Sequence, residues 1–204
     1  MSDTWQRGPL VTSDPLPGRR MNHPLASPPS LDESYNTSVE TFIKTCAGYC
    51  VATCIIGVGD RHNDNIMIKK NGNFFHIDFG HILGHFKSKF GIKRERSRFI
   101  FTPDFAFVMG GTQDARFERF QSLCIIAFNK IRENASLFLN LTSLMVSAGL
   151  PELQGPTDVN YMRDMLLLGE SEKVAGEKFL EWIQESLHTK TSQINNAIHT
   201  WKHS

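Results

Sequence analysis

The sequence of 204 residues has almost no net charge, since 22 basic and 21 acidic residues leave +1. No global field therefore draws the chain to nucleic acid or to an anionic membrane, and any such attraction must come from a local cluster. Long apolar runs are also lacking, because the longest nearly uncharged run, residues 45–59, is too short and too rich in glycine to span a bilayer. We expect no inserted segment, and the length predicts one domain of ordinary size plus a tail.

Cysteine is scarce, and four residues are too few for a disulfide framework. Cys46, Cys50 and Cys54 recur every four residues, which places them in one stripe of a helix, so we expect buried, reduced thiols. Metal ligation is the alternative, although no histidine or second cysteine pair stands near the stripe at a zinc-site spacing. The first 15 residues lack the basic, apolar and small-residue regions of a secretory signal, so a reducing, cytoplasmic location is expected.

Proline marks the expected start of the fold. Six of the nine prolines fall in the first 35 residues beside few large apolar side chains, so residues 1–36 are predicted to be a disordered tail outside the folded domain. The folded part, residues 37–204, is predicted to open at Thr37, where Thr37-Ser38-Val39-Glu40 matches a capping box. A helix buried along one face is expected from there to Gly57, because apolar residues recur at positions 39, 42, 43, 46, 47, 50, 51, 54 and 55.

A β-hairpin is expected over residues 65–78. Two β-rich runs flank Asn71-Gly72, the strongest short signal for a hairpin turn. If these two residues form a two-residue turn, the numbers of every cross-strand pair sum to 143, and Asn65 faces Asp78. Opposed residues hold their Cβ atoms roughly 4.5 to 5.5 Å apart, so an amide oxygen and a carboxylate are predicted to meet.

The remaining chain divides into a basic loop and a helical part. Residues 79–98 have no sustained period and a charge of +5, from six basic residues against Glu95. Charge runs usually mark a solvated face, and the rival partner, nucleic acid, is not expected because no aromatic stacking platform or recognition helix accompanies the loop. Residues 115–204 are predicted to be helical, with helices near 115–131, 137–145, 157–168, 172–188 and 191–202.

Three residues carry the candidate chemistry: Asp60, Asn65 and Asp78, the last of which opens Asp78-Phe79-Gly80. In kinases a loop aspartate meets the acceptor hydroxyl, while an asparagine five residues on and the aspartate of Asp-Phe-Gly hold Mg²⁺ against the nucleotide phosphates. The tripeptide Asp-Phe-Gly alone is a weak signal. Its predicted position opposite an asparagine that lies five residues after an aspartate would arise by chance much less often. The structural alternative is that Asp60 caps an acidic turn and Asp78 caps a strand end.

Residues 59–65, Gly-Asp-Arg-His-Asn-Asp-Asn, followed by 76–81, His-Ile-Asp-Phe-Gly-His, resemble the catalytic loop and the start of the activation loop of phosphoinositide 3-kinases. The order Asp-Arg-His distinguishes this family from protein kinases, which place histidine before the aspartate. The resemblance runs from about Val39 to the C-terminus. Residues 93–96, Lys-Arg-Glu-Arg, resemble the class I lipid-recognition box, and residues 102–110 look most like the gamma-type catalytic subunit.

This resemblance implies the C-terminal lobe of the phosphoinositide 3-/4-kinase (protein-kinase-like) fold, which is mainly α-helical with a small β-hairpin. Its catalytic loop would be residues 60–65 and its activation loop residues 78–103. ATP and Mg²⁺ would be the cofactors, with Asn65 and Asp78 as the metal ligands. Asp60 and His62 would serve the acceptor hydroxyl and the γ-phosphate, which His81 would also approach.

The same resemblance assigns the binding residues. Met67 and Ile77 would form the apolar floor under adenine, although a core role explains each equally well, and His76 is assigned to the fold. A phosphoinositide at the membrane surface would be the lipid partner, and its headgroup would meet Lys87, Lys89, Lys93 and Arg94. Lys93 and Arg94 would bind the 4- and 5-phosphates through charge-assisted hydrogen bonds.

We therefore predict a phosphatidylinositol 3-kinase that phosphorylates phosphatidylinositol 4,5-bisphosphate, is recruited peripherally to the plasma membrane and, in the full-length family, has a regulatory subunit. Nothing before Thr37 can form the smaller kinase lobe, so the isolated chain is expected to be nearly inactive. A truncated, non-catalytic or dominant-negative fragment and a related lipid or serine/threonine kinase are the alternatives. One local departure is Ser97-Arg98, where the family usually has valine and proline.

Overall fold

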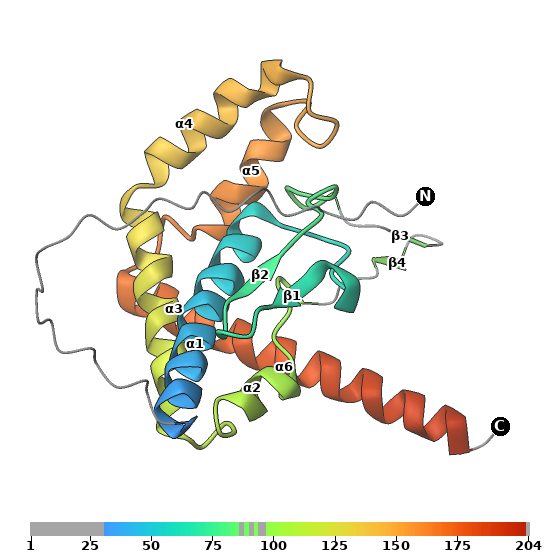
Figure 1. Ribbon diagram of the computed structural model, residues 1–204. Coiled ribbons are helices and arrows are strands. Elements are labelled where there is room, and N and C mark those ends of the chain that lie inside the picture. Colours follow the sequence, from blue (N-terminus) through green and yellow to red (C-terminus); the bar gives the residue numbers. More distant parts are fainter. Residues whose placement is uncertain (1–30, 86–87, 90–91, 94–96, 203–204) are drawn as a thin grey trace, which may run out of the picture.

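The computed structural model describes residues 31–85, 88–89, 92–93 and 97–202 (Figure 1). Most of these residues are helical and the strands form two short antiparallel pairs, which confirms the predicted class, mainly α-helical with a small hairpin. The elements in chain order are α1 (Leu31–Ile56), the 3-10 helix η1 (Asn63–Asn65), β1 (Ile66–Ile68), β2 (Phe74–His76), β3 (Ser88–Lys89), β4 (Ile92–Lys93), α2 (Pro103–Val108), α3 (Ala115–Glu133), α4 (Ala135–Met145), the 3-10 helix η2 (Val146–Ala148), α5 (Pro156–Met165) and α6 (Glu172–Lys202).

Helix α1 begins at Leu31, six residues before the predicted start. The expected capping box does not form, because the Thr37 hydroxyl donates back to the carbonyl of Glu33 (2.8 Å) inside the helix. Asp32 and Glu33 occupy the first turn, where negative charge complements the helix dipole. Residues 31–36 are therefore part of the folded chain, and the rest of the predicted tail, residues 1–30, lies outside the described residues.

Helix α1 is the central element of the core, packed against α3, α5 and β2 (Figure 1). All nine apolar positions predicted to face inward are buried, which confirms the 3.6-residue pattern. All four cysteines are free and buried, and burial raises the pKa of the Cys46, Cys54 and Cys124 thiols. By length and composition alone this helix could cross a membrane, but more than half of its apolar stretch is buried inside the protein, as in the core helix of a soluble domain.

The register of the first hairpin differs from the prediction by one residue. Ile66 pairs with His76, Met67 with Phe75, and Ile68 with Phe74, so the paired numbers sum to 142. The turn contains three residues, because the amide of Gly72 donates to the carbonyl of Lys69 and that of Lys69 to the carbonyl of Asn73. A type I turn followed by a left-handed glycine has this pattern, and Gly72 has φ +85°.

The shifted register changes which residue faces Asn65. The carbonyl of Asn65 accepts a hydrogen bond from the amide of Ile77 (3.0 Å), so Asp78 lies one residue beyond the position opposite Asn65. The prediction that Asn65 faces Asp78 directly is therefore wrong. The physical reason is the three-residue turn, which moves every cross-strand pair by one position. At its last residue, Gly72, the backbone lies so close to α1 that a Cβ atom would be 1.8 Å from the carbonyl oxygen of Ser38.

The C-terminal half is a set of helices around α1 and α3. Helix α6 is continuous from Glu172 to Lys202, where the sequence predicted two helices, and it passes behind α3 in the view of Figure 1. Helix α2 was not predicted as a helix; Thr102 caps it by accepting a hydrogen bond from the amide of Phe105, and Pro103 occupies its first turn. It contacts α6 and thereby closes the core below the hairpin.

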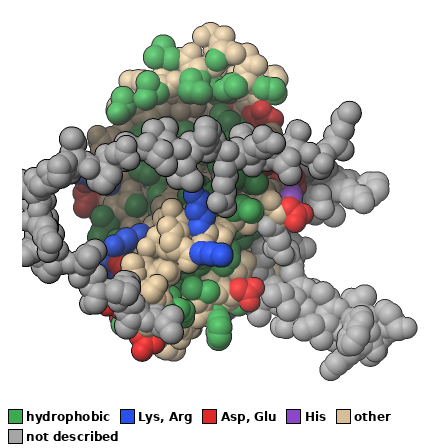
Figure 2. All heavy atoms as spheres, viewed as in Figure 1, with side chains coloured by type: hydrophobic (Ala, Val, Ile, Leu, Met, Phe, Trp, Pro, Cys, Tyr) green, Lys and Arg blue, Asp and Glu red, His purple; other side chains and the backbone are tan. Residues whose placement is uncertain are grey.

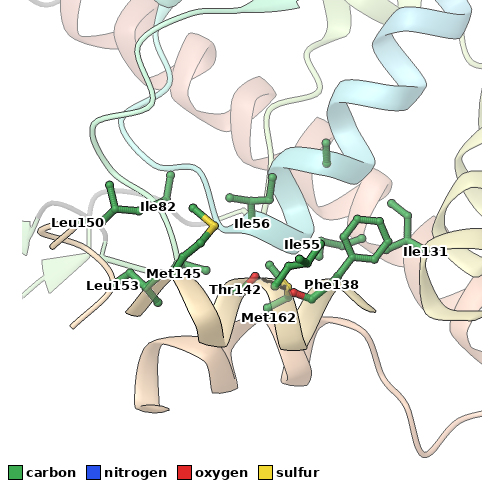
Figure 3. Close-up of a pocket in the computed structure, with 13 residues that line it drawn as sticks. Ile55, Ile56, Ile82, Ile131, Phe138, Thr142, Met145, Leu150, Leu153 and Met162 are labelled. Atoms are coloured by element: carbon green, nitrogen blue, oxygen red, sulfur yellow. Dashed lines mark hydrogen bonds between the residues drawn. The ribbon is translucent and has the colours of Figure 1, made fainter. Parts of the chain in front are cut away.

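Helix α4 turns much of its apolar side outward. Leu137, Leu141, Leu144 and Met145 are exposed, and Figure 2 shows apolar side chains gathered at the end of the molecule where Figure 1 places α4. Two of these residues, Leu141 and Met145, also line a cavity of about 370 Å³ with an almost wholly apolar lining (Figure 3). Its walls come from the ends of α1 and α3, from α4 and α5, and from residues 82–83, which follow the predicted Asp-Phe-Gly motif.

Candidate active site

Two loops meet at the C-terminal end of α1, and together they contain every predicted catalytic residue. The amide of Gly59 donates to the carbonyl of His81 (2.9 Å), and the amide of Leu83 donates to the carbonyl of Ile56. Because of these two hydrogen bonds, the segment before Asp60 lies alongside the segment after Asp78. The catalytic loop and the start of the activation loop are thus fixed to each other by backbone contacts.

The ring of Tyr161, a half-buried residue, lies against both loops. Gly57 and Gly84 have positive φ angles, and a Cβ atom on either one would be within 2.5 Å of the Tyr161 ring. Burial raises the pKa of this tyrosine. Sequence analysis assigned Tyr161 no role, because its position on α5, about 80 residues after the hairpin, gives no sign of this contact.

Asn65 is buried, and its amide group is oriented by the loop that precedes it. Its Oδ1 atom accepts a hydrogen bond from the amide of His62 (2.9 Å), and its Nδ2 atom donates to the carbonyl of Asp60 (2.8 Å). An amide oxygen has two lone pairs, so Oδ1 keeps one for a further partner. The hydrogen bond from Asn65 Nδ2 to the carbonyl of Asp60 therefore closes a loop, and the five-residue spacing is the length of that loop.

Both aspartates have left-handed backbones, with φ +55° at Asp60 and +57° at Asp78. Such angles are uncommon outside glycine, though aspartate tolerates them better than most residues, and they concentrate at functional sites. The Asp78 side chain is exposed, and its Oδ1 atom accepts a hydrogen bond from the amide of Gly80 (3.3 Å). The carboxylate is thus presented at the surface by a turn, two residues past the end of β2.

Arg61 connects the two loops, and sequence analysis gave it no role. Its Nε atom donates to the carbonyl of Gly59 (2.9 Å), Nη1 donates to that of Ile77 (2.7 Å), and Nη2 donates to that of Asp78. Burial lowers the pKa of its guanidinium, while the nearby Asp78 and Asp60 oppose that shift. The guanidinium fork therefore holds the backbone of the Asp78 segment directly.

The two predicted catalytic histidines occupy different loops. His62 is exposed, with Nε2 3.3 Å from Nδ2 of Asn65 and Nδ1 3.7 Å from a carboxylate oxygen of Asp64. His81 is half-buried and contributes its carbonyl to the bond with Gly59. The His62 side chain is therefore in contact with Asn65, whereas His81 is tied to the first loop through its backbone.

His76 is buried, in agreement with its assignment to the fold. Its ring stacks on Tyr49 with centroids 5.2 Å apart, and Nδ1 has no hydrogen-bond partner. Burial, with a smaller effect of Arg61, lowers the pKa of His76 to about 4, so the ring is neutral at pH 7. It packs the inner face of the hairpin against α1.

The outer face of the hairpin is apolar and open. Met67 pairs with Phe75, and Ile77 follows two residues after Phe75 on the same face. Met67, Ile77 and Phe79 are 43%, 42% and 49% exposed, which is high for such side chains beside a buried core. Neither Met67 nor Ile77 belongs to the core, so the alternative that explained them by core packing is wrong.

The predicted lipid-contacting residues are only partly described. The backbones of Lys89 and Lys93 lie in β3 and β4, which pair Ser88 with Lys93 and Lys89 with Ile92. Lys87 and Arg94 lie outside the described residues. Their role in binding a headgroup stays a prediction.

Comparison with known proteins identifies the family. The family model described as phosphatidylinositol 3- and 4-kinase matches residues 19–155, which is more than half of the chain. The chain belongs to this kinase family. The phosphatidylinositol 3- and 4-kinase match contains both loops of the site, from Gly59 to Leu83.

Three relatives from Dictyostelium discoideum agree with this assignment. Phosphatidylinositol 3-kinases 1, 2 and 3 of that organism are 54%, 51% and 48% identical to the chain over 172 residues, or 84% of its length. The matched region is 11%, 9% and 10% of those proteins, so the chain spans about a tenth of the length of the curated relatives it matches. These matches support the family and leave the gamma-type subtype a prediction.

The donor set suits the magnesium ion that this family implies. Mg²⁺ prefers oxygen ligands and usually takes one or two from the protein, with phosphates and waters completing the shell. Asn65 offers the second lone pair of a fixed Oδ1 atom, and Asp78 offers an exposed carboxylate. Within the described ranges, no cluster of three or more histidine, cysteine, aspartate or glutamate side chains offers a metal a competing site.

Proposed function

We propose that the chain is the C-terminal catalytic lobe of a phosphatidylinositol 3-kinase, which transfers the γ-phosphate of ATP to the 3-hydroxyl of phosphatidylinositol 4,5-bisphosphate. Family membership and the names of the Dictyostelium relatives support the lipid-kinase class. The observation that carries the proposal is the Arg61 fork. By binding the carbonyls of Gly59, Ile77 and Asp78, it holds together the two loops that carry Asp60, Asn65 and Asp78.

In this proposal Asn65 and Asp78 would hold Mg²⁺, which would neutralise the charge of the nucleotide phosphates. Asp60 and His62 serve the acceptor hydroxyl and the γ-phosphate, and His81 approaches the γ-phosphate from the second loop. Phosphoryl transfer requires mainly positioning and electrostatic stabilisation. The hydrogen-bonded loop from Asp60 to Asn65 supports such a role because it restricts the motion of both ends.

Adenine lies over Met67 and Ile77 in the same proposal. Their exposure on the outer face of the hairpin supports this, because a second surface is needed to cover them. In kinases the smaller lobe supplies that surface, together with a phosphate-covering loop and a lysine. The described part of the chain contains no counterpart of that lobe, so we expect the isolated chain to bind ATP poorly and to turn over little.

The lipid partner completes the proposal. Lys87, Lys89, Lys93 and Arg94 bind the headgroup phosphates of phosphatidylinositol 4,5-bisphosphate, and the enzyme is cytoplasmic with peripheral recruitment to the plasma membrane. Each basic residue close to an anionic surface contributes about 1 kcal/mol, so several together are enough for adsorption. A regulatory subunit acts on the full-length protein.

The test measures nucleotide binding and phosphate transfer with the purified chain. Wild type is compared with Asp78→Ala and with Asp104→Asn, which changes an exposed carboxylate on α2 outside the site. Mn²⁺, used in place of Mg²⁺ with ATP, should broaden the NMR signals of Asn65 and its neighbours in wild type and Asp104→Asn, and should leave Asp78→Ala unaffected. Equal broadening in all three proteins would contradict the metal site.

Transfer to phosphoinositide liposomes separates the remaining possibilities. No transfer above the Asp78→Ala level, from a folded chain, would agree with the expected inactivity and with a non-catalytic fragment. Transfer that Asp78→Ala abolishes would support the kinase and overturn the expected inactivity. Charge reversal of Lys93 and Arg94 should lower use of phosphatidylinositol 4,5-bisphosphate more than use of phosphatidylinositol, and an equal loss on both lipids would contradict headgroup recognition.

A further inference from the structure

The segment that follows the Asp-Phe-Gly motif has a strained backbone. Leu83 and Gly84 are consecutive residues with positive φ angles, +55° and +79°. Glycine adopts such angles freely, whereas a leucine with a positive φ is uncommon and strained. Strained residues persist only where the surrounding structure fixes them, and they concentrate at functional sites. The neighbours of Leu83 and Gly84 therefore decide the path that the chain takes after Asp78.

The first neighbour is the C-terminal end of α1. The amide of Leu83 donates to the carbonyl of Ile56 (2.6 Å), and the amide of Gly84 donates to the carbonyl of Gly57 (3.4 Å). The Leu83 side chain is buried. These contacts fix residues 83–84 against the residues that lead into Asp60. A shift of residues 83–84 would therefore move the second loop of the site relative to the first.

The second neighbour is the ring of Tyr161 on α5. An added Cβ atom on Gly57 would be 2.3 Å from Cε1 of this ring, and one on Gly84 would be 2.5 Å from Cδ2. Because Cε1 and Cδ2 belong to opposite edges of the ring, a single tyrosine spans both glycines. Both glycines have positive φ angles and no room for a side chain, so the close packing against the ring depends on glycine at both positions.

Helix α5 contacts the same segment at a second point. Asp158 precedes Tyr161 by three residues and therefore lies on the same side of the helix. One carboxylate oxygen of Asp158 lies 3.0 Å from Nε2 of His85, in the next position of the segment. The other oxygen accepts hydrogen bonds from the amides of Gln154 and Gly155 (2.8 and 3.1 Å). The carboxylate is thus fixed at the start of α5, and with the tyrosine it connects this helix to residues 84–85.

We propose that Tyr161 is a positioning residue for the metal site. Arg61 donates to the carbonyl of Asp78 at the start of the segment. Tyr161 packs against Gly84 at its end. Held at both ends, the segment would present the Asp78 carboxylate to Asn65 at one fixed separation, which a shared metal ion requires. This inference rests on the metal site of the proposed function.

Two substitutions of Tyr161 test the ring itself. Tyr161→Leu keeps an apolar side chain and removes the flat ring, so the contact with the two glycines is lost. We expect the metal affinity to fall about 10-fold or more, which is typical when a residue that supports a metal ligand is changed. Tyr161→Phe keeps the ring and should keep the wild-type affinity. An equal loss with phenylalanine and with leucine would contradict a role of the ring.

Phe128→Leu is the matched control for a general loss of stability. It makes the same aromatic-to-leucine change in the core between α3 and α6, where Phe128 packs against Phe179 and Trp182. This variant should unfold more easily than wild type, because it removes buried apolar contacts. Its folded form should bind the metal with the wild-type affinity.

Gly84→Ala tests the contact from the side of the loop. It places a Cβ atom 2.5 Å from the Tyr161 ring at φ +79°. Gly149→Ala is its control, because it adds the same methyl group at a similar angle, φ +75°, with no atom within 4 Å. Both variants have the same backbone strain, and only Gly84→Ala displaces the ring. Gly84→Ala should therefore weaken metal binding, and Gly149→Ala should not.

The experiment titrates Mn²⁺ in the presence of ATP into each 204-residue chain and follows the broadening of the NMR signals of Asn65. Asp78→Ala is the reference without the metal site. Hydrogen exchange of the Gly59 and Leu83 amides, which donate across the two loops, is measured in the same proteins without metal or nucleotide. In Tyr161→Leu and Gly84→Ala we expect a higher Mn²⁺ midpoint and faster exchange of these two amides relative to other buried amides of the same protein.

Each result has a distinct meaning. A wild-type Mn²⁺ midpoint in Tyr161→Leu would overturn the positioning role even with faster exchange, because the contact would then be structural only. Equal weakening in Tyr161→Leu and Phe128→Leu would overturn it as well, since loss of stability would be the cause. If Tyr161→Leu does not fold, equal midpoints for Gly84→Ala and Gly149→Ala overturn the role. Broadening that Asp78→Ala does not reduce would overturn the proposed metal site, and the inference with it.

Discussion

Replacement of Ser186 by alanine tests how strongly α6 holds the backbone of residues 99–101. The expected result does not depend on any assumed function. The hydroxyl is fully buried, accepts a hydrogen bond from the Phe101 amide at 2.8 Å, and lies 3.0 and 3.1 Å from the carbonyls of Phe99 and Phe101. One hydroxyl has one proton, so it donates to one of these carbonyls at a time. Alanine removes both the accepted and the donated bond and leaves the Phe101 amide unpaired in the core.

The cost follows from these two losses. A buried donor left without a partner costs about 1–3 kcal/mol, and a lost hydrogen bond about 1 kcal/mol more, so Ser186→Ala should lower the free energy of unfolding by about 2–4 kcal/mol. Urea denaturation followed by circular dichroism measures this, with an unchanged slope expected. The control is Ser122→Ala, an exposed serine bonded within its own helix to the carbonyl of Glu118, which should change stability by less than about 0.5 kcal/mol. A Ser186→Ala midpoint as high as that of Ser122→Ala would refute the anchoring argument.

Two further predictions concern the hairpin tip and the turn before α5. Gly72→Ala places a Cβ atom 1.8 Å from the carbonyl oxygen of Ser38, so thermal unfolding should show a larger loss than Gly111→Ala, which has φ +96° but no atom within 4 Å of its Cβ; equal losses would leave backbone strain as the sole cause. A hydrogen bond from the backbone amide of Gln154 is the main cause of the lowered pKa of Asp158. The Asp158 carboxylate therefore stabilises the fold at pH values above the pKa it has in the unfolded chain. This stabilisation is lost as the pH falls through the lowered pKa of the folded protein. Asp158→Asn should therefore reduce stability at pH 7, with a difference from wild type that shrinks below about pH 3.9, and a constant difference from pH 7 to pH 2 would contradict this.

The core of the fold could be predicted because one helix carries most of it. Every buried apolar position of α1 from Val39 to Ile55 was identified from the 3.6-residue period, which survives any error in where the helix begins; the buried Thr53 was not. The start itself could not be read, because Thr37-Ser38-Val39-Glu40 matches a capping box whether or not the chain before it is helical. Asp32 and Glu33 give the earlier turn its own favourable charges, and they lie in a segment whose prolines suggested disorder.

The hairpin shows how a correct motif can give a wrong register. Asn71-Gly72 fits a two-residue turn, and it equally fits the last two positions of a three-residue turn with a left-handed glycine. No local feature of the sequence distinguishes the two-residue turn from the three-residue turn. The close approach of Gly72 to Ser38 on α1 is a contact between distant parts of the chain, and it is compatible with the longer turn found here.

Helix α4 shows the limit of periodicity. Its uncharged sequence predicted a helix, and the structure has one, but Leu137, Leu141 and Leu144 face outward. Periodicity identifies an apolar face without indicating what that face packs against. In the described residues α4 packs against α5, and part of its apolar surface stays exposed.

The prediction of the candidate site from the sequence missed one connection, the one that Arg61 makes between the two loops. Sequence reasoning required Asn65 and Asp78 to face each other across the sheet, and they do not. Arg61 supplies the connection instead, by donating to the carbonyls of Ile77 and Asp78 from the loop that also positions Asn65. An arginine fork suits this task because its donors are planar and rigidly spaced, whereas a lysine offers one flexible ammonium group. The residue between the aspartate and the histidine of the motif therefore has a structural reason to be arginine, namely that its donors bind the carbonyls of Gly59, Ile77 and Asp78 and so keep together the two loops that carry Asp60 and Asp78.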